Sequence, residues 1–130
     1  MTVDLRGVTT LLMAGTGSDD DYAYRAFAGP LHEVGAVVVT PAPDPHRLIA
    51  NYEAALHEAT RAGAPIAVGG VSIGAAVAAN WALTHPDSTV AVLAALPAWS
   101  GAPGNAAAAL TARASAQQLR TDGLAATVAA

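Results

Sequence analysis

The chain has 130 residues, a length that suits one compact domain. Hydrophobic residues make up 53% of the chain and charged residues only 12%, so the composition predicts a buried core and excludes a disordered chain. The formal net charge is -4, all 6 basic residues are arginine, and there is no cysteine, which argues against a nucleic-acid binder and excludes a disulfide framework and thiolate chemistry.

The sequence predicts neither a membrane span nor a secretory leader. Its start carries Asp4 and Arg6, and its longest apolar stretch, near Val90 to Trp99, is about half the length that crosses a bilayer. We therefore expect a cytoplasmic protein whose partners include neither a membrane nor a nucleic acid.

Two strands and a helix are predicted in the first part of the chain. A short apolar run at Val8–Met13 ends in a glycine-rich loop, which is typical of a strand that runs into a turn. Apolar residues recur at helical spacing over Tyr22–Val34, after the acidic run Asp19–Asp21 that favours a helix N-terminus. The continuous run Ala36–Thr40 predicts a strand with both faces covered, as in a parallel sheet.

The same alternation continues toward the middle of the chain. Periodicity predicts helices over His46–Ala62 and Ala75–Thr84. Short apolar runs predict strands at Ile66–Val68 and Thr89–Leu96. Because strands that alternate with helices form right-handed crossovers, the sequence predicts an α/β fold with a parallel sheet of about four strands flanked by helices.

The segment beyond the last predicted strand is weakly patterned. An alanine-rich helix is expected over Ala106–Leu119, and Asp122 begins another. We therefore expect a core at residues 1–98 and, at residues 99–130, a helical C-terminal tail or the start of a helical cap.

One motif carries chemistry. Gly70-Val71-Ser72-Ile73-Gly74 matches G-x-S-x-G and lies between a predicted strand and a small-residue helix, which is the context that this motif requires. The serine of such a turn is strained, with φ above zero, and the two glycines let strand and helix backbones approach closely. The backbone N–H of Ile73, at the helix N-terminus, can donate to an oxyanion.

Together with a second loop, this motif resembles the N-terminal half of an α/β-hydrolase domain, over essentially the whole chain. The run Leu11–Ser18 is similar to the His-Gly-x-Gly-type loop that follows the first long central strand of such enzymes, with Ala14 in place of the histidine. The passage Trp81–Asp87 looks like the His-Pro turn that often follows the elbow helix in this family.

The resemblance implies a serine hydrolase that acts on an ester, thioester or related acyl bond of a small molecule. It makes Ser72 the nucleophile and the backbone N–H groups of Ile73 and Thr16 the oxyanion hole. Substrate-lining positions are expected at Gly15, Gly17 and Trp99. Neither a metal nor a cofactor is expected.

The family's acid and histidine follow the nucleophile in chain order, and the sequence has no match for the strands that carry them. Three histidines precede Ser72 and are interpreted as ordinary surface or half-buried residues, and the fourth closes the elbow helix at its far end and is interpreted as structural. They are His32, His46, His57 and His85. The catalytic machinery is therefore expected to be incomplete, which leaves three hypotheses: a truncated serine hydrolase, a half that is complemented by another chain, and a non-catalytic binding module.

A dinucleotide-binding turn is a weaker interpretation of the loop Gly15-Thr16-Gly17. Its third glycine is replaced by Asp20, and three successive aspartates repel a pyrophosphate, so the run Asp19–Asp21 is interpreted as a solvated acidic loop. A P-loop is excluded because the chain has no lysine.

The predicted strand Thr89–Leu96 contains neither the charges nor the proline that protect the edge of a sheet. We therefore expect this strand to be covered, by the helical tail after Asn105, by self-association of the chain or by a complementing C-terminal half.

Overall fold

The chain forms two compact units, which divide between Ala98 and Trp99. The computed structural model describes residues 2–98 and 101–129. The first unit contains a parallel sheet with its helices, and the second contains a helical segment.

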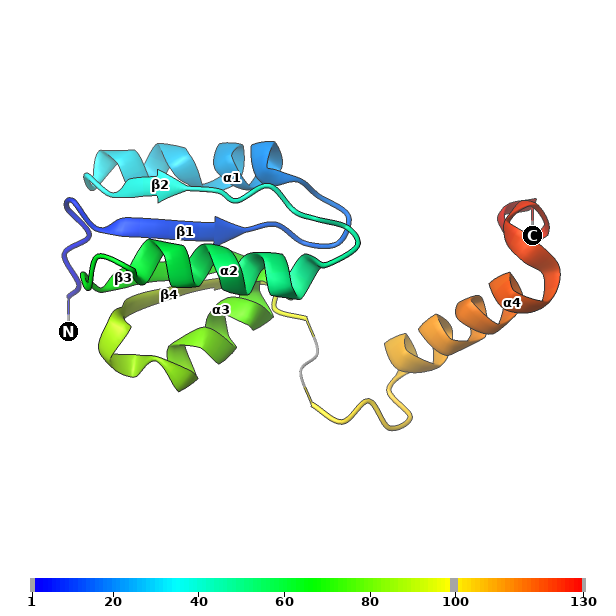
Figure 1. The fold of residues 1–130 in the computed structure, drawn as a ribbon. Helices are drawn as coiled ribbons and strands as arrows, with labels where there is room; N and C mark the ends of the chain where they lie inside the picture. The colour runs from blue at the N-terminus through cyan, green and yellow to red at the C-terminus, as the bar shows by residue number, and fades with distance from the viewer. Residues whose placement is uncertain (1, 99–100, 130) are drawn as a thin grey trace. The chain divides into compact units, whose positions relative to one another are not determined.

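A parallel sheet of four strands, in the order β2-β1-β3-β4, is the centre of the first unit. Its strands are β1 (Thr9–Met13), β2 (Val37–Val39), β3 (Ile66–Val71) and β4 (Thr89–Ala95). The connecting helices are α1 (Asp20–Glu33), α2 (Leu48–Thr60) and α3 (Ile73–Thr84), and a short 3-10 helix, η1 (Pro86–Ser88), leads into β4. Figure 1 shows the strands side by side with the helices stacked against them. The α/β fold predicted from the alternation is confirmed.

Two apolar layers, one on each face of the sheet, hold the helices in place. On one face, Leu11 of β1 packs in a buried cluster with Tyr52 of α2 and Trp81 of α3. On the other face, Leu12 packs in a second cluster with Leu31 of α1. Because successive side chains of a strand point to opposite faces, the neighbours Leu11 and Leu12 serve the two layers.

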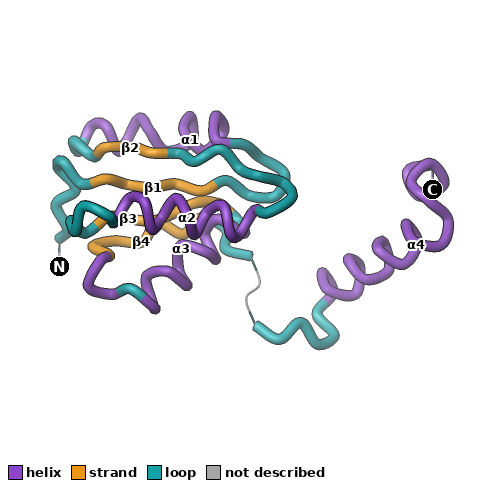
Figure 2. Tube along the Cα trace, in the orientation of Figure 1, coloured by secondary structure: helices purple, strands orange, loops and turns teal. Residues whose placement is uncertain are grey.

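The chain leaves the two central strands in opposite directions. From β1 it passes through α1 to β2 on one side, whereas β3 lies on the other side of β1 and continues through α3 to β4. β1 and β3 pair in register from Thr10 with Ala67 to Met13 with Gly70, so both strands end at the same edge. The loops that follow them lie at this edge (Figure 2). Parallel sheets bind ligands at such a switch point, outside the carboxyl ends of the strands.

Two strands differ from the expectation. β3 continues through Gly69-Gly70 rather than ending at Val68, because its pairing with both neighbours extends over the glycines. In β2, Val37 and Val39 are 49% and 38% exposed, so the expected covering of both faces is wrong. β2 is an edge strand, and only Val38 packs against the apolar layer under α1.

The second unit contains α4 (Ala107–Ala129), which confirms the predicted helical tail. Gly123, with a φ of 80° and a ψ of 172°, is not helical, so the segment is two helices joined by a kink. No residue of α4 is buried, and Leu124 is 70% exposed. In the part of the chain that the structure describes, no helix is both long and apolar enough to cross a bilayer.

β4 forms an edge of the sheet, and its outer side pairs with no strand of residues 2–98. Val90 and Val92 are 37% and 44% exposed on this strand. Thr89–Ala95 contains neither a charged residue nor a proline. A bare edge of this kind is a template for pairing with another chain.

We expect the chain to self-associate through β4, and Val92→Lys to weaken that association because a charge on the strand opposes edge-to-edge pairing. Light scattering over a concentration series measures the effect. Leu83→Lys is the matched control, because Leu83 is 82% exposed on α3 and receives the same charge away from the edge. A wild-type chain that stays monomeric at every concentration would contradict the prediction, as would equal effects of the two substitutions.

Candidate functional site

The loops after β1 and β3 meet in an open cleft at the carboxyl edge of the sheet. The cleft has a volume of about 700 Å³. Its lining residues are Gly15, Thr16, Gly17, Ser18, Asp19, Tyr22, Val71 and Ser72. A β-carbon built on Gly15 would lie 3.3 Å from the Cβ atom of Ser72, so the two loops are in contact. The structure therefore brings together the predicted site residues Gly15, Thr16, Gly17 and Ser72.

Ser72 has a strained backbone. It follows the last residue of β3, precedes the first residue of α3, and has a φ of 55° and a ψ of -116°. A positive φ is uncommon for a residue with a β-carbon, and a sparsely populated conformation of this kind costs about 1–3 kcal/mol. The positive φ expected from the G-x-S-x-G motif is confirmed.

The two glycines of the motif are required by the neighbouring strand. A β-carbon added at Gly70 or at Gly74 would overlap the carbonyl oxygen of Met13, the last residue of β1. A β-carbon at Gly74 would also lie 2.8 Å from the carbonyl oxygen of Ala14. The sequence predicted a close approach of strand and helix within the turn, and the structure adds that β1 is the main obstacle.

Of the two predicted oxyanion donors, Thr16 lines the cleft, and Ile73 directly follows Ser72, which also lines it. Ile73 is the first residue of α3, whose N-cap Ser72 makes no side-chain capping hydrogen bond. Neither the N–H of Ile73 nor that of Thr16 donates a hydrogen bond to any of the described residues. Unpaired N–H groups at a helix N-terminus attract negative charge, so this edge can stabilise an anion.

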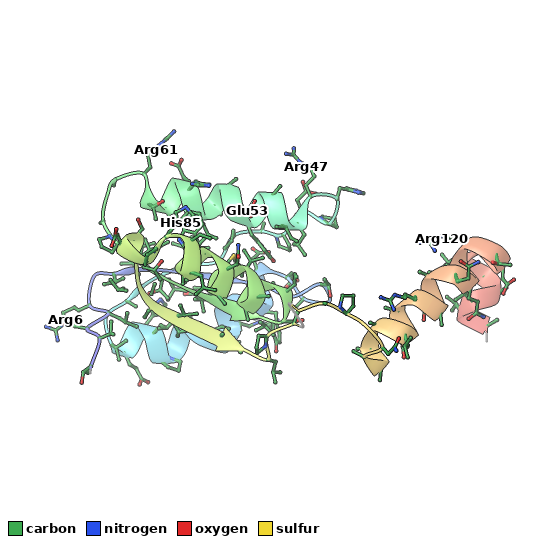
Figure 3. The ribbon with its side chains drawn as sticks, turned by 90° about the horizontal axis from the view of Figure 1, so that it is seen from below. Arg6, Arg47, Glu53, Arg61, His85 and Arg120 are labelled. Carbon is green, nitrogen blue, oxygen red and sulfur yellow. The ribbon has the colours of Figure 1, made fainter. Side chains whose placement is uncertain are left out.

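No base contacts the Ser72 hydroxyl within residues 2–98 and 101–129, since no histidine lines the cleft and no hydrogen bond reaches this hydroxyl. Two histidines pack instead around Trp81, where His85 is stacked at 3.7 Å and His57 stands edge-on at 4.8 Å between ring centroids. Figure 3 shows His85 at the end of α3, facing α2. His32 lies in the last turn of α1, and His46 precedes α2 and is exposed.

The peptide that joins Ala14 to Gly15 is held from two sides. The phenol of Tyr52, on α2, donates a hydrogen bond of 2.9 Å to the carbonyl oxygen of Ala14. The N–H of Gly15 donates a hydrogen bond of 2.9 Å to Oγ of Ser18. Both Tyr52 and Ala14 are fully buried. The loop that carries Thr16 therefore starts from a fixed peptide.

Sequence reasoning assigned Tyr52 only to the apolar stripe of its helix and missed this contact. The one feature of the sequence that could have indicated this contact is the presence of a phenol in a buried stripe, because a buried hydroxyl needs a hydrogen-bond partner. Burial raises the pKa of the Tyr52 phenol above its ordinary value of 10.0, and the negative charge of Asp20 raises it further.

The remaining expectations for the site have different outcomes. Trp99, expected to line the substrate pocket, lies outside the described residues. Asp19 was interpreted as part of a solvated loop; it is exposed, but it also lines the cleft. Within the described ranges, no group of three or more histidine, cysteine, aspartate or glutamate side chains is arranged to hold a metal ion.

Comparisons with protein-family models, with curated proteins and with solved structures found no match. The chemistry of the cleft is therefore inferred from its geometry. Among the described residues, neither the hydroxyl of the strained Ser72 nor the N–H groups of Ile73 and Thr16 have a hydrogen-bond partner. A serine hydroxyl can attack a carbonyl carbon, and free N–H groups can stabilise the oxygen that becomes negative.

We expect Gly74→Ala to lower the free energy of unfolding by about 3 kcal/mol or more, because the new methyl group has no room beside the carbonyl of Met13. Urea unfolding measures the change. Gly17→Ala is the control, because a β-carbon there meets no atom within 4 Å, and it should change the stability by less than about 1 kcal/mol. Equal losses for both variants would contradict the close approach of β1.

We expect Tyr52→Phe to lower the free energy of unfolding by about 1–3 kcal/mol at neutral pH, because the buried carbonyl of Ala14 loses its donor. The raised pKa means that the native chain holds the phenolic proton more tightly than the unfolded chain does. This contribution is complete below pH 10.0 and is lost as the pH rises through the folded-state pKa.

The difference in stability between wild type and Tyr52→Phe should therefore shrink above pH 10.0. Urea unfolding over a pH series measures it. Tyr24→Phe, at a tyrosine that is 43% exposed on α1, is the control and should match the wild type throughout. A Tyr52→Phe chain as stable as the wild type would show that the phenol does not fix the loop.

Proposed function

We propose that Ser72 is the nucleophile of a serine hydrolase of the α/β-hydrolase type, acting on an ester, thioester or related acyl bond of a small molecule. One observation carries this proposal: Ser72 has a φ of 55° at the junction of β3 and α3. Backbone strain of this size persists only where the surrounding structure enforces it, and it occurs preferentially at functional sites. The strand order β2-β1-β3-β4, with Ser72 and the loop after β1 at the switch point, supports the same proposal.

In this mechanism, Oγ of Ser72 attacks the carbonyl carbon of the substrate. An Oγ–carbon bond forms, the hydroxyl proton passes to a base or to solvent, and the electron pair of the carbonyl π bond moves to the carbonyl oxygen. The N–H groups of Ile73 and Thr16 would stabilise that oxyanion, together with the N-terminal end of α3. Collapse of the tetrahedral species breaks the bond to the alcohol or thiol, which leaves with a proton, and water then hydrolyses the acyl-serine.

The proton of the Ser72 hydroxyl needs an acceptor, and none of the described residues that line the cleft is a histidine. Without a general base the hydroxyl is a weak nucleophile, and the loss of a triad member costs several orders of magnitude in rate. Residual catalysis then comes from the oxyanion donors and from binding. We therefore expect little turnover from these residues alone and fast turnover only where a base is supplied.

The lack of a histidine among the described residues that line the cleft favours a second candidate function. A cleft with oxyanion donors and no histidine among its described lining residues can bind an acyl ligand without turning it over, either as a binding module or as one half of a complemented enzyme. Both candidates share Ser72 and differ in the fate of the bound molecule.

We expect a fluorophosphonate probe to label Ser72 slowly, because no base among the described residues activates the hydroxyl but the phosphoryl oxygen of the product occupies the position of the oxyanion. The Oγ–phosphorus bond forms, the phosphorus–fluorine bond breaks and fluoride leaves, while the hydroxyl proton passes to solvent. Mass spectrometry of the digested chain locates the label. Hydrolysis of an activated ester should be slow and should disappear in Ser72→Ala.

Ser88→Ala is the matched control for this experiment, since Ser88 is also half-buried but lies just before β4, at the amino end of that strand. It should leave labelling and hydrolysis unchanged. Turnover that survives Ser72→Ala would place the chemistry elsewhere. Fast turnover that depends on Ser72 would show that a base acts in this chain.

A further inference from the structure

The segment at the end of β4 holds the backbone of Ser72 on both sides. The N–H of Ser72 donates a hydrogen bond of 3.0 Å to the carbonyl oxygen of Ala95, the last residue of β4. The carbonyl oxygen of Ser72 accepts a hydrogen bond of 3.0 Å from the N–H of Ala98. Residues 95–98 therefore fix the two peptide groups that flank the strained residue.

The second of these hydrogen bonds departs from a regular ladder. β3 and β4 are parallel, and their register places Ser72 level with Leu96. In a parallel ladder, a residue donates to the neighbour before its partner and accepts from the neighbour after it. The regular donor to the carbonyl of Ser72 would thus be Pro97, which has no N–H. Ala98 donates instead, so the chain forms a bulge of one extra residue after β4.

Leu96 carries the backbone strain of this bulge. Among the described residues, Ser72 and Leu96 are the two non-glycine residues with a positive φ, which is 46° at Leu96. Glycine is the usual residue in such a conformation, because a β-carbon makes it strained. The side chain of Leu96 is 83% exposed, so its burial does not offset the strain. Uncompensated strain beside the candidate nucleophile indicates a functional role for the bulge.

The bulge fixes the direction of one predicted oxyanion donor. The carbonyl of Ser72 and the N–H of Ile73 belong to one planar trans peptide, so they point in opposite directions. Two donors hold this carbonyl: the N–H of Ala98 at 3.0 Å and that of Ala76, in α3, at 3.1 Å. The N–H of Ile73 is therefore aimed although it has no acceptor among the described residues. Hydrogen bonds to the carbonyl also polarise the peptide and strengthen this N–H as a donor.

We infer that the bulge at Leu96 and Pro97 positions the oxyanion hole. It places the N–H of Ala98 on the carbonyl of Ser72, and it thereby aims the N–H of Ile73 at the acyl oxygen. This inference rests on the proposed function, in which Ile73 stabilises the oxyanion. It adds Leu96 and Pro97 as positioning residues, which act through the peptide between Ser72 and Ile73.

Two substitutions at exposed residues weaken the bulge. Pro97→Ala supplies the missing N–H, which can donate to the carbonyl of Ser72 in a regular ladder and so compete with Ala98. Leu96→Val places a β-branched residue at a positive φ, which such residues rarely adopt. Leu96→Gly is the matched rescue, because glycine adopts a positive φ without strain. Pro86→Ala is the control, because Pro86 is also exposed and begins η1, before the amino end of β4.

The full chain is labelled with a neutral alkyl fluorophosphonate, and the second-order rate constant is measured by intact-mass spectrometry. NMR follows the amide proton of Ile73, which should move downfield on labelling because it donates to the phosphoryl oxygen. Pro97→Ala and Leu96→Val should lower the rate constant about threefold or more and reduce the downfield movement, because fewer chains have the N–H aimed. Leu96→Gly and Pro86→Ala should match the wild type.

Urea unfolding of each variant separates positioning from stability. Variants Pro97→Ala and Leu96→Val that lose stability but keep the wild-type rate constant and the downfield movement of Ile73 would overturn the inference. A Leu96→Gly chain that is labelled as slowly as Leu96→Val would also overturn it. Where Leu96→Val fails to fold, Pro97→Ala decides.

A measurement without chemistry keeps the inference separate from the proposed function. The Cα and Cβ chemical shifts of Ser72 report its backbone conformation in the unlabelled chain. They should change in Pro97→Ala and Leu96→Val and match the wild type in Leu96→Gly. If this pattern appears in a chain that the probe does not label, the nucleophile is refuted and the positioning is retained. Shifts that are equal in all four chains would overturn the inference even where Ser72 is labelled.

Discussion

The close approach of the end of β1 to the turn after β3 is the contact on which the site depends. The carbonyl of Met13 occupies the space that a β-carbon at Gly70 or Gly74 would need, so the turn is built from glycine on both sides of Ser72. The same approach brings Gly15 against the side chain of Ser72. Two loops that are far apart in the chain thereby become the two walls of one cleft.

This contact is held by the apolar layer beneath it. Met13 belongs to the buried cluster that includes Tyr52 of α2 and Trp81 of α3. Tyr52 also reaches the carbonyl of Ala14, so packing of α2 and the position of the loop after β1 are linked through one side chain. Burial of this layer offsets the strain at Ser72, which costs about 1–3 kcal/mol.

The electrostatic character of the cleft follows from how two helices begin. α3 begins at Ser72 without a side-chain cap, so its free N–H groups stay available to an anion. The N-cap of α1 is Asp19, whose carboxylate accepts the N–H of Tyr22 and so satisfies one of the free N–H groups of that helix. The two helices that begin at this cleft therefore differ, because a carboxylate caps the N-terminus of α1 and no side chain caps that of α3.

Local patterns in the sequence determined the alternation of strands and helices, the G-x-S-x-G turn and the positive φ of Ser72, because periodicity and the demand for glycine act over a few neighbouring residues. Only the tertiary structure decided that Val37 and Val39 stay exposed, since strand order places β2 at an edge. It alone joined Tyr52 to Ala14, which are 38 residues apart, and placed Tyr22 and Ser72 in the lining of one cleft. Such contacts arise from packing between distant segments, and no local pattern encodes them.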